Sequence, residues 1–323
     1  MAYRMIVREP GGVEQFAAVE MARPEPAAGE ILMRHTAIGL NFIDVYHRTG
    51  LYPMAQSRDF TPGGEAVGIV EAVGAGVTIP LGARVGTVFG GGAYASHRVI
   101  PAQQAVVLPD AISDEVAAAV MLKGLTANYL ITHSYPVRAG ETVLVHAAAG
   151  GVGLILGQWL AALGVRAIGT AGGAAKCALA RAHGYAEVID YRAQDFVAEV
   201  RRLTQGAGVP VVYDSVGRDT VMRSLDVLQS FGTLVSFGQS SGPVTEFKIT
   251  DLTRGSLRLT RPTLVHHVAQ AGWLAQASEA LFAQIIAGRI KVEIGARFAL
   301  SDVAAAHSAL EGRQTSGSTV LIP

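Results

Sequence analysis

A glycine-rich stretch near the middle of the chain has residue types and spacing that could bind the pyrophosphate of a dinucleotide. Residues 144–164 read LVHAAAGGVGLILGQWLAALG, so Gly150, Gly151 and Gly153 stand between an apolar run and a segment with helical spacing. Such glycines permit a tight turn, close approach of the backbone to the phosphates, and close packing of helix on strand. Ala148 occupies the first glycine position of the common pattern, the one most dependent on backbone angle. A structural glycine turn is the alternative, but the strand–turn–helix context favours a dinucleotide site.

The residues after the second strand of this region bear on the choice of nucleotide. An NAD site would have an Asp or Glu there, about 20 residues beyond the turn, to bind the ribose 2′-hydroxyl. The strand candidate 165–171 is instead followed by GGAAKC, without an acid. A carboxylate would repel a 2′-phosphate, so its absence permits NADP. Lys176 could pair with that phosphate; a solvated surface lysine is the alternative.

The histidines and cysteines do not form a metal-binding pattern. Zinc alcohol dehydrogenases of similar layout carry a Gly-His-Glu element and cysteine ligands. Here the comparable stretch 62–68 reads PGGEAVG, with Gly64 where the histidine would stand, and Cys177 is the single cysteine. None of the nine histidines forms a His-x-x-x-His pair. We expect no metal site.

A polar and aromatic cluster is the best candidate for the wall of a substrate pocket. The segment NFIDVYHRTGLYP contributes Asn41, Asp44, Tyr46, His47 and Tyr52 within twelve positions. So many polar groups are costly to bury unpaired, which favours a pocket wall over a core. Hydride transfer without metal needs orientation and a water-poor pocket, and such a cluster could provide both.

An alternation of strands and helices positions the glycine turn. Strand candidates follow one another from residue 141, separated by segments with helical spacing, and two of those helices end at Gly164 and Gly184. Strands buried on both faces with helices between them indicate a parallel, doubly wound sheet. The strand candidates are 142–147, 165–171, 187–191, 209–216 and 232–238, with SLRLTRPTL as a sixth.

The two ends of the chain have a different texture. The first 120 residues read as short strands punctuated by Gly and Pro, followed by one or two helices within SDEVAAAVMLKGLTANYLITH. After a long helix in VAQAGWLAQASEALFAQIIAGRI, the chain ends as strand, capped helix and strand. The overall class is therefore α/β, with a nucleotide domain inserted into a β-rich domain. We predict domains at 1–122, 123–262 and 263–323, the last a return to the first.

Composition and charge limit the partners. The 323 residues are 50% hydrophobic and 16% charged, with 26 basic and 26 acidic residues and no net charge. Neither a nucleic acid nor a membrane is expected as a partner, since both attract a basic excess. No signal-peptide core stands at the N-terminus, no apolar run reaches about 18 residues, and one cysteine excludes an internal disulfide. These features favour a cytoplasmic location.

Six segments together resemble one family along essentially the whole chain. They are NFIDVYHRTGLYP, LKGLTANYL, HAAAGGVGLI, VVYDSVGRDT, VSFGQSSGPV and GSLRLTRPTL. They resemble the zinc-free quinone oxidoreductases, the zeta-crystallin-like group of the medium-chain dehydrogenase/reductase superfamily. The Ala-x-Gly-Gly-Val-Gly turn is the usual form in this group. The resemblance implies a GroES-like catalytic domain with an inserted Rossmann domain, NADPH as cofactor, and hydride or one-electron transfer from NADPH to a quinone.

The resemblance also implies roles for individual residues. On the nicotinamide and quinone side it implies Asn41, Tyr46 and Tyr52 as catalytic residues. The implied cofactor-binding residues are Asn41, Lys123, Thr126, Gly150, Gly151, Val152, Gly153, Gly172, Lys176, Tyr191, Phe237, Gln239 and Arg313. Of these, Gly172, Lys176 and Tyr191 would surround the adenosine 2′-phosphate. Gln239 departs from the asparagine of many relatives, which changes the reach of its amide.

Other functions and assemblies remain open at this point. An NADPH-dependent enone or enoyl-thioester reductase uses the same fold, and a crystallin-like or RNA-binding role is a non-catalytic alternative. The lack of net charge argues against strong RNA binding. The resemblance further implies a homodimer, or a tetramer, formed by pairing the outer strands SLRLTRPTL of two Rossmann sheets.

Overall fold

The protein, described here by a computed structural model, divides into two compact units. The structure describes residues 2–56, 58–88 and 90–323. The first unit comprises residues 1–123, 271–286 and 292–323, and the second comprises 124–270 and 287–291.

The second unit contains a six-stranded parallel sheet. Its order is β10-β9-β8-β11-β12-β13, so the first strand in the chain lies third and the sequence reverses beside it. The strands are β8 (Thr142–Val145), β9 (Arg166–Ala171), β10 (Glu187–Asp190), β11 (Val209–Asp214), β12 (Leu228–Ser236) and β13 (Arg258–Thr260). All six expected strands are present, although the last is only three residues long. This is the doubly wound arrangement, and ligands of such sheets bind at the carboxyl ends of the strands where the order reverses.

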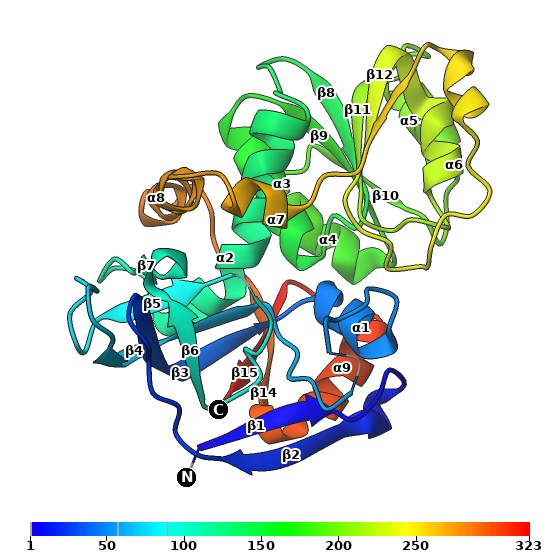
Figure 1. The fold of residues 1–323 in the computed structure, drawn as a ribbon. Helices are drawn as coiled ribbons and strands as arrows, with labels where there is room; N and C mark the ends of the chain where they lie inside the picture. Colours follow the sequence, from blue (N-terminus) through cyan, green and yellow to red (C-terminus); the bar gives the residue numbers. More distant parts are fainter. Residues whose placement is uncertain (1, 57, 89) are drawn as a thin grey trace. The chain divides into compact units, whose positions relative to one another are not determined.

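Helices cover both faces of this sheet (Figure 1). Those labelled α3 (Gly151–Ala162) and α4 (Ala174–Ala182) lie on one face, and α5 (Phe196–Leu203) and α6 (Val221–Ser224) lie on the other. The core between α5, α6 and the sheet is aliphatic, with Leu144, Val212 and Leu234 fully buried. Because apolar side chains fill both faces of the strands, only the strand ends are available for polar chemistry.

The first unit is built on a seven-stranded sheet and a two-stranded sheet. The larger sheet has the order β14-β15-β3-β4-β5-β7, with β6 paired to β3, and β1 pairs antiparallel with β2 in the smaller one. The strands are β1 (Ala2–Val7), β2 (Phe16–Met21), β3 (Glu30–Leu40), β4 (Glu65–Val73), β5 (Arg84–Thr87), β6 (His97–Pro101) and β7 (Val106–Val107). The strand β2 was not predicted from the sequence, because its residues are mostly half-exposed and carry only a weak apolar signal.

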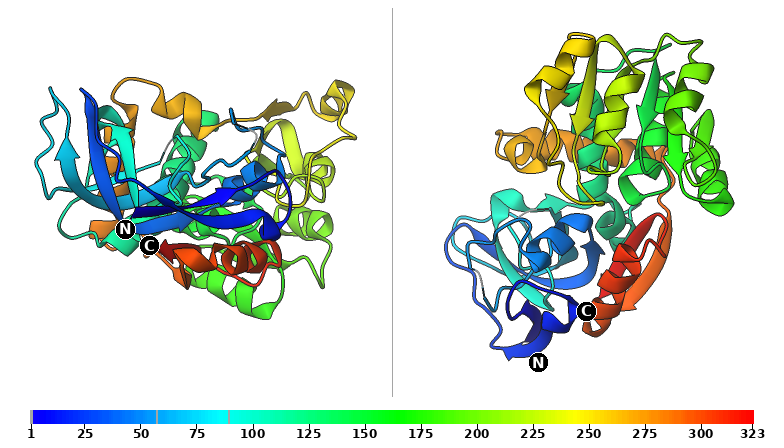
Figure 2. Two further views of the ribbon diagram at one scale, coloured as in Figure 1. Left: turned by 60° about the horizontal axis from the view of Figure 1, so that its bottom comes forward. Right: turned by 90° about the vertical axis from the view of Figure 1, so that its right-hand side faces the viewer.

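The C-terminal segment returns to this sheet. It forms β14 (Ile294–Ala299), α9 (Val303–Glu311) and β15 (Ser318–Ile322), the strand–helix–strand order expected from the sequence. The strand β15 pairs antiparallel with β3, and β14 pairs parallel with β15. Figure 2 shows these red and orange segments beside the blue N-terminal strands. The first unit is therefore closed by the end of the chain.

Besides short 3-10 and π-helical turns, the described residues form four further α-helices. They are α1 (Phe42–Thr49), α2 (Asp114–Tyr129), α7 (Leu264–Val268) and α8 (Trp273–Ile286). The single long helix expected over 268–290 is wrong at its start. Gly272 has φ 77°, a left-handed conformation that a continuous α-helix does not accommodate, so α7 ends before it and α8 begins after it.

Candidate cofactor and substrate site

The glycine turn lies between β8 and α3 in the second unit. The Gly150 N–H donates to the Ala147 carbonyl at 2.9 Å, and the first helical bond runs from Leu154 N–H to the Gly150 carbonyl. The N–H groups of residues 151–153 precede that bond, so they belong to the helix end that attracts anions. The sequence-predicted residues Gly150, Gly151, Val152 and Gly153 thus come together in one turn.

The backbone strain of this turn falls one residue earlier than expected. Ala147 adopts the left-handed conformation with φ 54°, whereas Ala148 is absent from the positive-φ residues of the described chain. Ala148 is buried and donates its N–H to the Thr170 carbonyl at 2.9 Å. A Cβ added to Gly169 would lie 2.7 Å from the Ala148 Cβ, so Ala148 packs against that glycine. The alanine therefore needs no special backbone angle.

Gly153 brings the helix close to the turn. A Cβ at this position would lie 2.4 Å from the Ala147 carbonyl oxygen and 2.7 Å from that of Ala148. The Tyr185 hydroxyl donates to the Gly153 carbonyl at 2.7 Å and fixes the helix from the other side. Only glycine fits here, as expected for close helix–strand packing.

A buried network of hydrogen-bonded polar side chains lies next to the turn, and it was not predicted from the sequence. The His146 ring bonds Thr170 Oγ1 and Ser224 Oγ through its two nitrogens, each at 2.9 Å. The Asp214 carboxylate accepts from the N–H groups of Val216 at 2.8 Å and Gly217 at 3.0 Å. Ser224 Oγ lies 3.4 Å from that carboxylate, so this network joins the carboxyl ends of the adjacent strands β9, β8 and β11.

The residues expected at the adenosine end gather beyond β9 and β10. A Cβ at Gly172 would lie 2.5 Å from the Tyr191 hydroxyl oxygen and 3.2 Å from Arg192 Nε. Lys176 is half-buried in the first turn of α4, two residues beyond its start. Arg192 is a further cation at this edge that the sequence analysis did not select, and its position beside Tyr191 was the available signal.

One carboxylate does lie near this edge, at the end of the third strand of the unit. Asp190 accepts hydrogen bonds from the N–H groups of Gly173 at 2.9 Å and Arg192 at 3.0 Å. These two bonds lower the pKa of the Asp190 carboxyl. The carboxylate is therefore occupied in fixing the two loops, and β9 itself ends without an acid, as the sequence indicates.

The loop after β12 packs on the turn after β11. The Phe237 N–H donates to the Asp214 carbonyl at 2.8 Å. A Cβ at Gly217 would lie 2.8 Å from the Gln239 Cα. Phe237 and Gln239, both expected to contact a cofactor, are thus held at the carboxyl edge of the sheet. Thr126, another expected cofactor residue, lies buried in α2.

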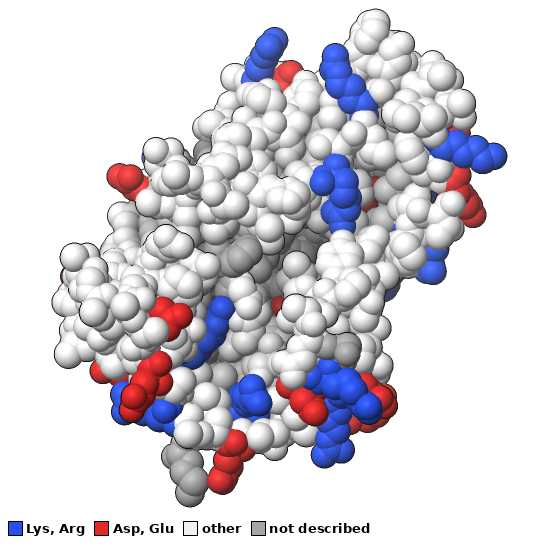
Figure 3. Space-filling model, in the orientation of Figure 1, with Lys and Arg blue, Asp and Glu red and all other residues white. Residues whose placement is uncertain are grey.

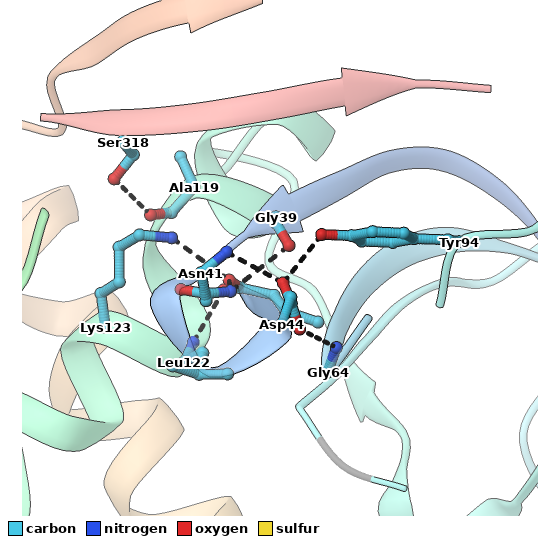
Figure 4. A network of polar contacts seen from close by, with 10 residues as sticks. Gly39, Asn41, Asp44, Gly64, Tyr94, Ala119, Leu122, Lys123 and Ser318 are labelled. Carbon is cyan, nitrogen blue, oxygen red and sulfur yellow. Dashed lines mark hydrogen bonds and ion pairs between the residues drawn. The ribbon is translucent and has the colours of Figure 1, made fainter. Parts of the chain in front are cut away.

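In the first unit, Asn41 precedes α1 within a network of buried polar groups (Figure 4). Its amide nitrogen Nδ2 donates to Glu65 Oε2 at 2.9 Å and to the Gly39 carbonyl at 3.3 Å. Lys123 Nζ lies 3.4 Å from the same Glu65 oxygen. The structure therefore brings together Asn41 and Lys123, two predicted cofactor residues that are far apart in the sequence.

Asp44 occupies the centre of the same network. Its carboxylate accepts from Asn41 N–H at 2.9 Å, Gly64 N–H at 3.2 Å and the Tyr94 hydroxyl at 3.0 Å. The Tyr94 hydroxyl also lies 2.9 Å from His307 Nε2. Burial raises the pKa of Asp44 to about 7. Asp44, in the first turn of α1, is therefore part of the buried interior of the first unit, which differs from the pocket wall expected for the whole cluster.

The two predicted aromatic residues lie together, Tyr46 within α1 and Tyr52 shortly after its end. The ring centroids of Tyr46 and Tyr52 are 5.0 Å apart, and the Tyr52 N–H donates to the Tyr46 carbonyl at 3.0 Å. Tyr46 is buried and Tyr52 half-buried. Arg313 follows α9 in the left-handed conformation, with φ 57°.

The residues present do not fit a zinc ion. Gly64 has no donor atom where the zinc dehydrogenases have histidine, and its N–H is bonded to Asp44. Within residues 2–56, 58–88 and 90–323, no group of three His, Cys, Asp or Glu side chains could hold a metal.

Comparisons with known proteins agree with this geometry. Residues 27–110 match the family described as alcohol dehydrogenase GroES-like domain, and residues 151–280 match zinc-binding dehydrogenase. The chain is 48% identical to a quinone oxidoreductase of Pseudomonas aeruginosa, with all of both chains covered. It is 40% identical to a 2-haloacrylate reductase of a Burkholderia species, covering 100% of this chain and 99% of that protein.

A solved structure gives the same result. The crystal structure of Escherichia coli quinone oxidoreductase complexed with NADPH matches with a TM-score of 0.97 and 47% identity, covering 99% of this chain and 100% of the other. A GroES-like sheet unit and a doubly wound unit with a glycine turn are the features of a medium-chain dehydrogenase/reductase. Within that superfamily, the chain belongs to the zeta-crystallin-like quinone oxidoreductases.

Proposed function

We propose that this protein is an NADPH-dependent quinone oxidoreductase that works without a metal. The observation that carries the proposal is the full-length match to the Escherichia coli quinone oxidoreductase, whose structure is complexed with NADPH. The glycine turn at the start of α3 supports it, because free N–H groups and a close backbone approach suit a pyrophosphate.

The predicted site residues are carried into this proposal. The turn 150–153 holds the pyrophosphate, while Gly172, Lys176 and Tyr191 surround the 2′-phosphate. Lys123 and Thr126 contact the ribose and phosphate beside the nicotinamide, with Asn41, Tyr46 and Tyr52 on the nicotinamide and quinone side. The remaining cofactor contacts are Phe237, Gln239 and Arg313. The functional domains are 1–122, 123–262 and 263–323.

In this mechanism the protein contributes binding and orientation. NADPH supplies the hydride when it is bound, and the chain's own groups hold the reactants in register and exclude water. Asn41 suits that task because its amide nitrogen is fixed by Glu65 and Gly39. A side chain with a locked amide loses little conformational entropy when a ligand contacts it.

Side-by-side turnover tests the proposed substrate class. Purified protein with NADPH should reduce a benzoquinone or naphthoquinone much faster than an alkenal or an acyl-CoA enoate. Equal protein, cofactor and acceptor concentrations keep the comparison matched. Reduction of the alkenal alone would show that the quinone assignment is wrong.

A conjugated double bond is the second candidate acceptor. The full-length match to a 2-haloacrylate reductase favours it, since that name describes reduction of a carbon–carbon double bond beside a carboxylate. The same assay with 2-chloroacrylate separates the two candidates. Turnover of 2-chloroacrylate above that of the quinones would favour this second function.

Assembly and location are parts of the same proposal. We infer a homodimer formed through β13, which lies at one edge of the second unit's sheet. The exposed Phe231 lies in the neighbouring strand β12, where its carbonyl accepts from the Arg258 side chain of β13, and the exposed Ile249 precedes β13 by nine residues. In the described part of the chain no helix is long and apolar enough to span a bilayer. The face drawn in Figure 3 carries basic and acidic side chains interspersed. A cytoplasmic location and the lack of a nucleic-acid partner stay predictions.

A further inference from the structure

One buried carboxylate holds two of the proposed cofactor-binding side chains. Glu65 Oε2 accepts from Asn41 Nδ2 at 2.9 Å and lies 3.4 Å from Lys123 Nζ (Figure 4). Its other oxygen, Oε1, accepts from the Leu122 N–H at 2.7 Å. Glu65 is fully buried, and Asn41 and Lys123 are each 6% exposed. Glu65, which directly follows Gly64, was not among the site residues predicted from the sequence.

The surroundings of Glu65 are built to receive this carboxylate. A Cβ added to Gly39 would lie 2.2 Å from Glu65 Oε2 and 2.3 Å from the Ala118 carbonyl, so only glycine leaves room at this point of β3. The Leu122 N–H fixes which oxygen faces α2. The second oxygen therefore faces only donors, an amide and an ammonium group.

The arrangement determines which atom of Asn41 can meet a ligand. A side-chain amide has two N–H donors and one oxygen acceptor. Both donors of Asn41 are directed to protein acceptors, Glu65 and the Gly39 carbonyl. Its oxygen Oδ1 is then the atom that can serve a ligand, and it can only accept.

We propose that Glu65 is a positioning residue for cofactor binding, which sets the polarity of Asn41 and anchors Lys123. Asn41 Oδ1 is thereby presented to an N–H or O–H donor of the nicotinamide nucleoside, a carboxamide or a ribose hydroxyl. This inference rests on the proposed function, because contact of Asn41 and Lys123 with NADPH is part of that proposal.

The substitution E65Q tests the polarity directly. Because Leu122 N–H still needs an acceptor, the new amide would direct its NH₂ at Asn41 Nδ2 and at the Lys123 ammonium, so that donors would face donors. Asn41 would then turn its oxygen inward and present N–H to the ligand. We expect the Kd for NADPH to rise at least about tenfold, since a mismatched hydrogen bond in a buried site weakens binding by about that factor. The KM for NADPH should rise more than kcat falls.

The double substitution E65Q/N41D provides the rescue. The introduced aspartate would accept from the introduced glutamine amide, pair with Lys123 and keep an acceptor for the ligand, while the Gly39 carbonyl would lose its donor. We expect the Kd to fall clearly below that of E65Q without reaching the wild-type value, as the buried donors regain partners. Ser318→Ala is the matched control: it removes a buried 2.7 Å bond to the Ala119 carbonyl of α2 without touching Glu65. It should lower thermal stability and leave the Kd unchanged.

Fluorescence titration with NADPH and thermal unfolding test this role of Glu65. Both are measured for the wild type, E65Q, E65Q/N41D and Ser318→Ala. Wild-type affinity in E65Q, or a double variant no better than E65Q, overturns the proposal. Should E65Q fail to fold, side-chain amide NMR of the wild type decides: the Asn41 Nδ2 protons should stay protected from exchange with and without NADPH. Loss of that protection on NADPH addition overturns it. A wild type that binds NADPH but reduces no quinone contradicts the proposed function alone, because the titrations still decide the role of Glu65.

Discussion

At the scale of single residues, we expect the choice between NADPH and NADH to depend on side chains beyond β9 and β10. Gly172 and Tyr191 are in contact there, Arg192 adds a cation, and the one nearby carboxylate, Asp190, is bonded to two backbone N–H groups. A phosphate in this neighbourhood would meet cations and a hydroxyl, which suits a charge-assisted site.

Replacing Lys176 by Ala should therefore affect the two cofactors differently. We expect the Kd for NADPH to rise about 10- to 100-fold and that for NADH to change by less than about threefold, because a hydrogen bond to a charged group contributes about 1.5–3 kcal/mol. Titration with both nucleotides measures this. Lys248→Ala, at an exposed lysine of the same unit, is the control and should change neither Kd. Equal losses with NADPH and NADH would contradict the assignment of Lys176.

A further prediction concerns the effect of the buried His307 ring on how the free energy of unfolding depends on pH. Burial, and then the Arg48 charge, lower its pKa from 6.5 to about 3. Between these two values the unfolded chain binds a proton that the folded chain does not, so this contribution to stability is full above pH 6.5 and is lost as pH falls. The loss is about 1.4 kcal/mol per pH unit. Asp44 acts in the opposite direction, because its raised pKa stabilises the folded state at lower pH.

The variant His307→Gln should accordingly have a flatter pH profile. Denaturant unfolding between about pH 4.5 and 7.5 should show the free energy of unfolding falling less steeply toward acid, by about 1.4 kcal/mol per pH unit below the usual histidine pKa. His133→Gln, at an exposed histidine, is the control and should keep the wild-type slope. An unchanged slope in His307→Gln would show that this ring does not resist protonation.

At the scale of elements, the proposed pyrophosphate site depends on the close contact of α3 with the turn before it. Gly153→Ala would push a methyl group into two carbonyl oxygens, at 2.4 and 2.7 Å. Overpacking of this kind costs about 1–3 kcal/mol. We expect lower thermal stability and an NADPH Kd raised more than about tenfold, because the N–H groups of the helix end would move.

A second glycine of the same helix separates stability from binding. A Cβ at Gly157 would lie 2.3 Å from the Tyr185 ring and 2.7 Å from the His183 carbonyl, so it would reach the turn only through the Tyr185 bond to the Gly153 carbonyl. Gly157→Ala should therefore lose comparable stability and lose less affinity for NADPH than Gly153→Ala when measured below its melting temperature. If both variants lost affinity in step with stability, the turn would have no specific role.

Much of the second unit could be predicted from the sequence, because its signals are local. Apolar runs alternating with segments of helical spacing located every strand from β8 to β12 to within about four residues, and the glycine turn located the start of α3. Ala148 showed where local reasoning stops: the pattern assigned it the strained backbone, whereas the structure assigns that strain to Ala147. A backbone angle depends on the carbonyls and N–H groups that each residue meets across the fold, which the pattern does not contain.

The polar network of the first unit could not be predicted in the same way. Asn41 and Tyr46 were selected from their neighbours in the sequence, but Glu65 and Tyr94 act through partners 24 and 50 residues away. Buried polar groups need partners wherever the chain brings them, so their identity depends on tertiary structure. The domain limits and the roles of the individual site residues stay predictions.

At the scale of the whole molecule, we expect the edge strand β13 to mediate assembly. An exposed strand edge offers unpaired N–H and carbonyl groups to another chain. Phe231 is 65% exposed. It lies beside the start of β13, because its carbonyl accepts a hydrogen bond from the Arg258 side chain. Light scattering on the purified protein should give twice the mass of the chain.

Two substitutions at equally exposed apolar residues test that interface. Phe231→Glu should shift the protein toward the monomer by adding charge beside β13, whereas Leu81→Glu, also at a 65% exposed residue but in the first unit, should leave the dimer intact. A wild type that is monomeric at micromolar concentration, or a dimer insensitive to Phe231→Glu, would contradict assembly through this edge.

The function that this chain's family and site support is the transfer of reducing equivalents from NADPH to a quinone without a metal. The most direct measurement follows the absorbance of the reduced nicotinamide during naphthoquinone reduction, with NADPH or NADH and with or without a chelator. We expect kcat/KM for NADPH to exceed that for NADH at least about tenfold, as a 2′-phosphate contact requires, with no effect of the chelator. Preference for NADH, loss of activity with chelator, or no quinone-dependent oxidation of NADPH would show that this chain is not a metal-independent NADPH:quinone oxidoreductase.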